Sequence, residues 1–219
     1  MDKTLIFIDG ENLWLRYKAL KKAGRVPRND TIEHADCFIW NPLIFGDNLW
    51  DIRRISYYTS VVGDEKKVKK AREIIGLVEY TVNVDSMPIM GNEKDAEKCI
   101  ISPKTGQIMP FVRKKSSKSK KEGICDIAIA VDVMRACYRD HADTIWIFSG
   151  DGDFVKLFEE IVHSGKCAYA SAFSSGLNDE IKYSVDEFYL LDDAFFLPIE
   201  SVGATQGNDA QQFVEGQRP

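Results

Sequence analysis

Three aspartates follow short apolar runs, at positions where their carboxylates could share one cation. Asp9 ends the apolar run 4–9, and Asp151 and Asp153 follow the run 144–148, with a glycine between them. Clustered carboxylates repel one another unless a hard divalent cation joins them, and oxygen ligands favour Mg²⁺ or Mn²⁺ over zinc. Such an ion, or a pair of ions, activates water and stabilises the charge on a phosphate under attack. The pattern therefore predicts metal-dependent chemistry on a phosphate ester.

Two further acids lie on the apolar segment 123–138, which is expected to form a helix. Asp126 falls in its first turn and is predicted to join the metal site, although an acid there is also favoured by the helix dipole. Asp132 lies six residues on, about 120° around the helix from Asp126; it is predicted to be structural or to support the site. An ordinary alternative exists for Asp153 as well, because it could cap a helix that begins at Phe154.

Alternating strands and helices are the elements that must position these acids. The order indicates an α/β fold with a mainly parallel sheet covered on both faces. In such sheets functional residues gather beyond the carboxyl ends of the strands. A helix with Leu13, Tyr17 and Leu20 on one stripe is expected after Asp9, and the helix 123–138 is expected to be largely buried, with Ile124, Ile127, Val131 and Met134 on one face. The expected strands are 4–9, 51–62, 79–84, 144–148, 167–172 and 188–191; the expected helices are 12–23, 64–78, 123–138, 154–164 and 177–184, with a short helix near Pro42.

Residues 86–122 interrupt this alternation and are predicted to be an inserted arm. Residues 98–101 and 107–113 are expected to form a hairpin that turns at 103–106. The strip 113–121 holds six positive charges and no acid, and is predicted to be mobile. It is either a solvated loop or a contact for the phosphates of a nucleic acid, because lysines supply affinity there without sequence preference. The lysines concerned are Lys114, Lys115, Lys118, Lys120 and Lys121.

Composition narrows the class of protein. The chain has 219 residues, 44% of them apolar, and a formal charge of −5. This is enough apolar material for one domain with a buried core, and no apolar run approaches the roughly 20 residues that span a bilayer. The five cysteines are widely spaced and form no metal-binding or disulfide pattern. We expect a cytoplasmic protein that does not bind membranes, with a disordered tail at 200–219.

Three motifs together resemble the NYN domains of the PIN-like nuclease superfamily, and their order is nearest to the LabA-like branch. They are Asp9-Gly10-Glu11-Asn12, the segment 123–132 with its two aspartates, and Ser149-Gly150-Asp151-Gly152-Asp153-Phe154. The resemblance spans residues 3–193 within a predicted domain 1–195. It implies a three-layer α/β/α sandwich and a Mg²⁺ or Mn²⁺ site made by Asp9, Asp126, Asp151 and Asp153. It also implies that Asn12 orients Asp9 or a bound phosphate and that Ser149 helps to hold the loop.

These observations favour a metal-dependent ribonuclease that cleaves single-stranded or structured RNA. A non-catalytic RNA-binding or regulatory module on the same fold is the alternative. A phosphohydrolase with an aspartyl nucleophile ranks last, because Asp9-Gly10-Glu11 lacks a second Asp two residues after the first. The sequence leaves open whether the chain forms a homodimer.

Overall fold

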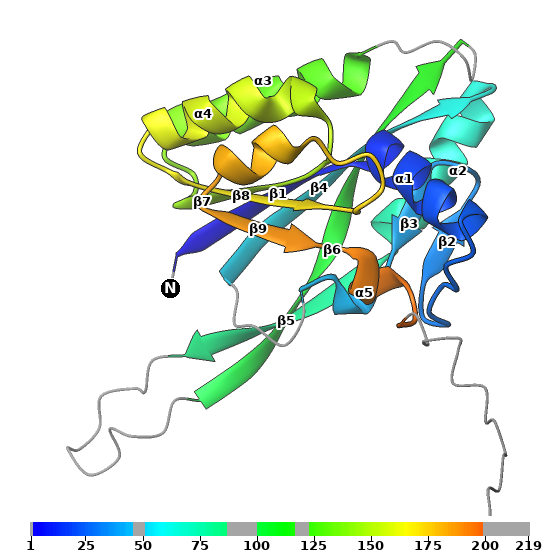
Figure 1. Cartoon of the computed structure of the whole chain (residues 1–219), viewed down its shortest axis with the longest axis horizontal. Helices are drawn as coiled ribbons and strands as arrows, with labels where there is room; N and C mark the ends of the chain where they lie inside the picture. The colour runs from blue at the N-terminus through cyan, green and yellow to red at the C-terminus, as the bar shows by residue number, and fades with distance from the viewer. Residues whose placement is uncertain (1, 46–50, 87–99, 117–122, 199–219) are drawn as a thin grey trace, which may run out of the picture.

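Within the residues that the structure describes, seven strands form one sheet at the centre of the protein (Figure 1). The computed structural model describes residues 2–45, 51–86, 100–116 and 123–198. The strands are β1 (Lys3–Asp9), β4 (Asp51–Val62), β5 (Glu79–Ser86), β6 (Ile100–Lys115), β7 (Thr144–Phe148), β8 (Cys167–Ala172) and β9 (Glu187–Leu190). Their order is β5-β6-β4-β1-β7-β8-β9, and neighbours in this part of the chain run parallel except for the antiparallel pair β5 and β6.

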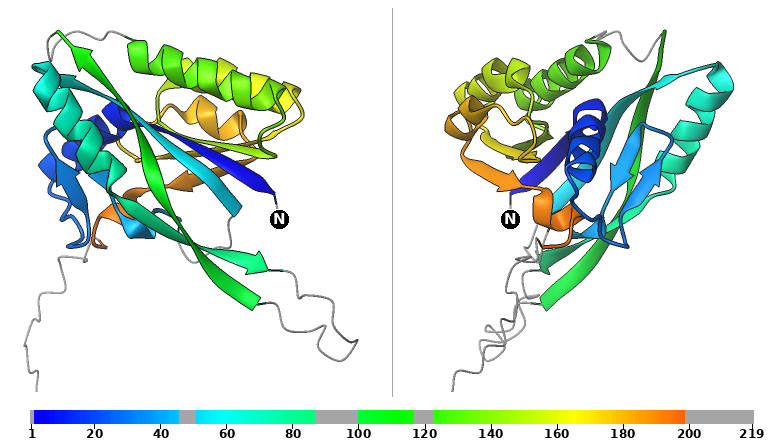
Figure 2. Two further views of the ribbon diagram at one scale, coloured as in Figure 1. Left: turned by 180° about the vertical axis from the view of Figure 1, so that it is seen from behind. Right: turned by 45° about the vertical axis from the view of Figure 1, so that its right-hand side comes forward.

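Helices cover both faces of this sheet, which confirms the predicted α/β sandwich (Figures 1 and 2). Side chains alternate between the faces of a strand, so that β1 contributes to two cores. Ile6 and Ile8 pack with the helices of one face, whereas Leu5 and Phe7 pack with those of the other. The first face carries α1 (Gly10–Lys22) and α2 (Glu65–Gly76); the second carries α3 (Ile124–Tyr138), α4 (Val155–His163) and the 3-10 helix η3 (Asp179–Tyr183).

The stripe predicted on the first helix is confirmed. Leu13, Tyr17 and Leu20 of α1 are buried, and the ring of Tyr17 contacts the rings of Phe173 and Phe196. This packing holds α1 against the sheet, and the helix begins immediately after β1 ends. The first residues of α1 therefore stay at the carboxyl edge of the sheet.

The predicted arm contains a different structure from the one expected. Residues 100–115 form one continuous strand, so the hairpin predicted to turn at 103–106 is wrong. The first half of β6 pairs antiparallel with β5, and its second half pairs parallel with β4. Gly106 is no turn residue: it lies opposite Tyr80, and a Cβ at Gly106 would come within 2.5 Å of the Tyr80 hydroxyl. A glycine inside a strand leaves room for such a close neighbour.

The prediction of which face of α3 is buried is also wrong. The sequence predicts a largely buried helix with Ile124, Ile127 and Val131 on one face, but these three residues are 45%, 67% and 49% exposed. The buried face consists instead of Cys125, Ile129, Val133, Ala136 and Cys137. These are small or β-branched side chains, which let the helix approach the sheet closely.

The remaining elements are short. They are the two-stranded sheet of β2 (Ile32–His34) and β3 (Phe38–Trp40), which the sequence did not predict, the 3-10 helix η1 (Pro42–Phe45), which it did, η2 (Gly152–Phe154) and α5 (Asp192–Phe195). The predicted disordered tail at 200–219 lies outside the described residues, as do residues 87–99 and 117–122 of the predicted arm. Across the described ranges, no helix combines the length and apolar character needed to cross a bilayer.

Candidate functional site

Asp9 is a buried carboxylate at the carboxyl end of the central strand. Only 2% of the surface of Asp9 is exposed to solvent. One carboxylate oxygen, Oδ1, accepts a hydrogen bond from the backbone N–H of Asn12 at 3.1 Å, and Oδ2 accepts one from the Ser149 hydroxyl at 2.9 Å. The second contact follows from topology, because β1 and β7 are parallel neighbours and Ile8 pairs with Phe148. The residues after both strands therefore meet.

The loop after β7 is tied to the same network. The Asn12 side-chain oxygen accepts from the backbone N–H of Gly150 at 3.2 Å, and the N–H of Asp151 donates to the Ser149 hydroxyl at 3.2 Å. Asp151 in turn accepts from the N–H of Asp153 at 3.1 Å and so caps η2. The sequence offered Asp153 as the cap of the helix that follows it, but α4 begins after Phe154 without a side-chain cap. Asp9, Asn12, Ser149 and Asp151 are joined in one hydrogen-bonded unit.

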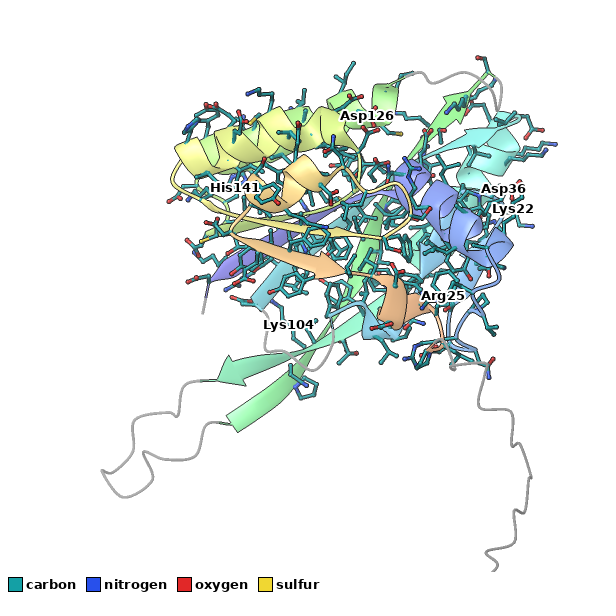
Figure 3. All side chains as sticks on the ribbon, in the orientation of Figure 1. Lys22, Arg25, Asp36, Lys104, Asp126 and His141 are labelled. Atoms are coloured by element: carbon teal, nitrogen blue, oxygen red, sulfur yellow. The ribbon has the colours of Figure 1, made fainter. Side chains whose placement is uncertain are left out.

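Asp126 lies on the first turn of α3 (Figure 3), close enough to act on Asp9 electrostatically. Burial is the largest factor that raises the pKa of Asp9 to about 7, and the negative charges of Asp126 and Glu11 add to it. The hydrogen bonds from Asn12 and Ser149 oppose the rise but do not cancel it. Full ionisation of Asp9, Asp126 and Glu11 is therefore unfavourable. A bound cation would neutralise this negative charge.

Gly10, between Asp9 and Glu11, lets the chain pass close to β4. A Cβ at Gly10 would come within 2.2 Å of the Tyr57 ring and 2.9 Å of the Tyr58 carbonyl oxygen. Any side chain there would push the start of α1 away from the sheet. The Asp-Gly-Glu order of the sequence therefore has a packing reason.

Asp9 and Asp126 form an acidic centre, and Glu11 belongs to it as well, although the sequence alone assigned Glu11 no role. Its carboxylate accepts hydrogen bonds from Lys115 at 2.7 Å and from the Cys125 thiol at 3.4 Å. Burial opposes the ionisation of Glu11, but hydrogen bonds from Lys115, Ser60 and Cys125 outweigh it and hold the pKa of Glu11 below its usual value. The one signal in the sequence is its place two residues after Asp9.

The predicted lysines fall into two groups. Lys115, at the end of β6, is paired with Glu11 and its side chain is 12% exposed; Lys114 lies on the opposite face, 55% exposed and 4.0 Å from Glu65. Lys118, Lys120 and Lys121 lie outside the described residues. Phosphate binding by these lysines stays a prediction, with Lys115 already beside the acidic centre.

Asp132, predicted to be structural or to support the site, contacts neither Asp9 nor Ser149 among the interactions of the described residues. Its Oδ2 accepts from the Tyr58 hydroxyl at 2.8 Å, and its other oxygen is paired with Arg135. Asp132 is therefore held between α3 and β4, about one and two-thirds helical turns from Asp126.

Arg16 is a cation at the site that the sequence did not point to. It lies one turn beyond Asn12 on α1, and its guanidinium packs against Gly176, where a Cβ would come within 2.0 Å of a guanidinium nitrogen. The Nε atom of Arg16 is buried without a hydrogen-bond partner in the described structure. Gly176 belongs to the loop after β8, and its carbonyl oxygen lies near Gly150. A guanidinium thus stands next to the loop that holds Ser149 and Asp151.

The donor chemistry of the site fits a hard cation. Among the residues that the structure describes, no three His, Cys, Asp or Glu side chains are grouped closely enough to hold a metal ion. Mg²⁺ commonly binds proteins through one or two carboxylates and completes its shell with water and substrate phosphates; Asp9, on which the negative charge of Asp126 acts, offers one such carboxylate. The larger site of four aspartates stays a prediction.

Comparison with known proteins bears on the family and on the fold. The family model described as the NYN domain matches residues 46–192, which include Asp126, Asp151 and Asp153, whereas Asp9 and Asn12 precede the matched range. The crystal structure of a protein of unknown function from Vibrio parahaemolyticus is similar, with a TM-score of 0.54 and 16% identity over 90% of this chain and 96% of that one. At that identity the likeness concerns the fold alone. No curated protein matches the chain.

Proposed function

The chain belongs to the NYN domain family, and from that premise we propose that it is a metal-dependent ribonuclease whose reaction centre lies at Asp9. NYN domains are typically nucleases, which supports the class of reaction. The order of the motifs supports, as part of the same proposal, a position nearest to the LabA-like branch. The substrate is RNA, cleaved by hydrolysis of a phosphodiester bond.

The single observation that carries this proposal is the buried Asp9 carboxylate, whose pKa is raised to about 7 chiefly by burial. A protein core tolerates such a group only at a cost in stability. The hydrogen bonds from Asn12 and Ser149 fix both oxygens of Asp9, so the carboxylate is held in one orientation rather than left to relax. A destabilised, oriented carboxylate at the carboxyl edge of a parallel sheet is typical of a catalytic position.

Each neighbouring residue has a role in this scheme. A bound Mg²⁺ or Mn²⁺ would supply activated water and neutralise charge that develops on the phosphate. Asp9 and Asp126 would hold the cation, with Asp151 and Asp153 as the further acids of the predicted four-aspartate site. Asn12 and Ser149 hold Asp9 and the loop after β7 in fixed positions relative to each other. Arg16 offers its guanidinium to a substrate phosphate, a group that arginine recognises well.

One observation favours the alternative, a non-catalytic module that binds RNA. Within the described residues, the acids do not form a ready group of three ligands. A module of that kind would use Arg16, Lys114 and the basic strip without a metal. Its RNA affinity would fall with salt and stay unchanged on addition of EDTA.

The test is cleavage of labelled single-stranded and hairpin RNA in Mn²⁺, in Mg²⁺ and in EDTA. Wild type is compared with Asp9→Asn and Asp151→Asn, and with Asp143→Asn as the matched control. Asp143 precedes β7 and accepts from the N–H of Lys3, so it lies at the opposite edge of the sheet. We expect metal-dependent cleavage by wild type and by Asp143→Asn, with a loss of about 100-fold or more in the two site variants.

Two outcomes would contradict the proposal. Cleavage that persists in both site variants would place the activity elsewhere or in a contaminant. Tight RNA binding by all four proteins without any cleavage would replace the nuclease with the binding module.

A further inference from the structure

A pocket of ≈ 360 Å³ lies between α3 and the second half of β6, beside the acidic centre. It contains aromatic, cationic and acidic side chains together. It is lined by Tyr58 of β4, by Phe111 and Arg113 of β6, and by Cys125, Ala128, Val131 and Asp132 of α3. In the described structure none of these residues bonds to Asp9 or to the loop after β7.

The alternation of side chains along β6 explains why the pocket is open. Ile108 and Val112 face the core beneath α2, whereas Met109, Phe111 and Arg113 face the other way. α3 covers β1 and the adjoining part of β4, and the end of β6 runs beside its N-terminal end (Figure 2). Within the described structure the α3 side of β6 is left partly open, with Met109 43% exposed.

One wall of the pocket contains a stacked pair of aromatic rings. The rings of Tyr58 and Phe111 are stacked with centroids 4.6 Å apart and planes 6° from parallel. The Tyr58 hydroxyl donates to Asp132 Oδ2 at 2.8 Å, so that the ring and the carboxylate fix each other. Phe111 is only partly buried. Tyr58 is buried, so Phe111 is the ring of this rigid pair that a ligand can reach, and Asp132 is an acceptor at the edge of Tyr58.

This aromatic pair adjoins the acidic centre directly. Cys125, which lines the pocket, donates its thiol to Glu11 at 3.4 Å. Lys115 follows Phe111 and Arg113 on the same face of β6 and reaches the other Glu11 oxygen at 2.7 Å. One strand therefore carries an aromatic ring, then a guanidinium, then an ammonium toward the acids. A base and its phosphate, which are joined through one sugar, match this order.

We propose that the pocket binds one nucleobase of the RNA and prefers a base with an exocyclic amino group to uracil. This inference rests on RNA being the substrate, as proposed above. Aromatic rings stack on the faces of all bases, which supplies affinity without selectivity. The carboxylate of Asp132 only accepts hydrogen bonds, so it pairs with the amino group of cytosine, adenine or guanine. At the position of the cytosine amino group uracil presents the carbonyl oxygen O4, which the carboxylate repels, and its N3–H is the only donor on that edge.

The size of the pocket agrees with a single base. Pockets that enclose small molecules measure roughly 300 to 1,000 Å³, and this one is near the lower end. Arg113 is exposed at its mouth, where a guanidinium can stack on the base or contact the following phosphate. The pocket therefore selects a nucleotide next to the bond to be cleaved.

The experiment measures binding, not cleavage, so that it is independent of the nuclease proposal. Fluorescence anisotropy in EDTA follows short labelled RNAs made only of cytosine, adenine or uracil. Wild type is expected to bind the cytosine and adenine RNAs more tightly than the uracil RNA. Phe111→Ala should weaken binding of all three by about tenfold, and Phe111→Trp should restore it, because one lost stacking contact is worth about that much.

Asp132→Asn gives the readout that a merely structural role would not move. The amide still accepts from Tyr58 and adds a donor, so the preference for amino-bearing bases should shrink while uracil binding improves. Met109→Ala is the matched control, since Met109 is exposed on the same face of β6 but does not line the pocket. Urea midpoints verify that each variant is folded.

Three results would overturn the inference: equal effects of Phe111→Ala and Met109→Ala, an unchanged base preference in Asp132→Asn, or no binding of any of the three RNAs by wild type. Base-selective binding without cleavage would leave the pocket in place and refute the nuclease. Cleavage by a protein whose Phe111 and Asp132 variants behave as wild type would do the reverse.

Discussion

Replacing Asp9 by Asn should stabilise the metal-free protein at pH 8. The pKa of Asp9 is raised from 3.8 to about 7, mainly by burial. The folded state therefore binds the proton more tightly than the unfolded state, and its stability falls as the pH rises from about 4 to about 7. Each pKa unit corresponds to about 1.4 kcal/mol, so the full penalty above pH 7 is about 4 kcal/mol. An amide carries no charge and escapes it.

The gain should be smaller than that ceiling. An asparagine still accepts from the N–H of Asn12 with its oxygen, but its NH₂ group faces the Ser149 hydroxyl, which now has to act as acceptor. We expect Asp9→Asn to raise the free energy of unfolding by about 1 to 4 kcal/mol at pH 8. At pH 5 the electrostatic penalty on wild type falls to about 1.6 kcal/mol, because the folded protein then holds the proton while most unfolded chains have lost it; the penalty vanishes only below about pH 4.

The assay is urea denaturation of both proteins in EDTA at pH 5 and pH 8, with Asp143→Asn as the control for loss of one charge. Excess Mg²⁺ or Mn²⁺ at pH 8 should stabilise wild type and have less effect on Asp9→Asn, since a ligand that binds only the folded state stabilises it. A variant no more stable than wild type at pH 8, or a gain of the same size at both pH values, would refute the reasoning.

Three further outcomes follow from the same geometry. Arg16→Gln should weaken RNA binding and flatten its salt dependence, with little change in the urea midpoint, as measured by anisotropy across a salt series. Ser149→Ala removes the hydroxyl that donates to Asp9 and should destabilise the fold by about 1 to 3 kcal/mol at pH 8 in urea denaturation. Lys115→Gln removes the cation beside Glu11, so an NMR titration of the Glu11 carboxyl should show its pKa rising; an unchanged pKa would contradict the pairing.

The meeting of Asp9 and Ser149 can be predicted from sequence because it depends on one topological rule. Both residues follow short apolar runs, and parallel strands bring their carboxyl ends to one edge. The buried strands 144–148 and 167–172 are predictable to the residue for a related reason. Strands buried on both faces are continuous apolar segments, and polar or glycine residues mark their ends.

The contacts of Glu11 could not be predicted in the same way. Its partner Lys115 is 104 residues away in sequence and belongs to a strand whose position depends on pairing with β4. The predicted buried face of α3 was wrong for a different reason. Both faces of that helix are apolar, so hydrophobic periodicity gave no means of choosing the face that packs against the sheet.

The error over β6 has a functional consequence. Pro103 and Gly106 resemble turn residues locally, yet both lie in the half of β6 that pairs with β5. Because the chain continues as one strand instead of turning back, its second half runs parallel to β4 and reaches the carboxyl edge of the sheet. That continuation brings Phe111 onto the ring of Tyr58 and Lys115 onto Glu11. A segment that looks like an insertion in the sequence thus builds the outer wall of the candidate site.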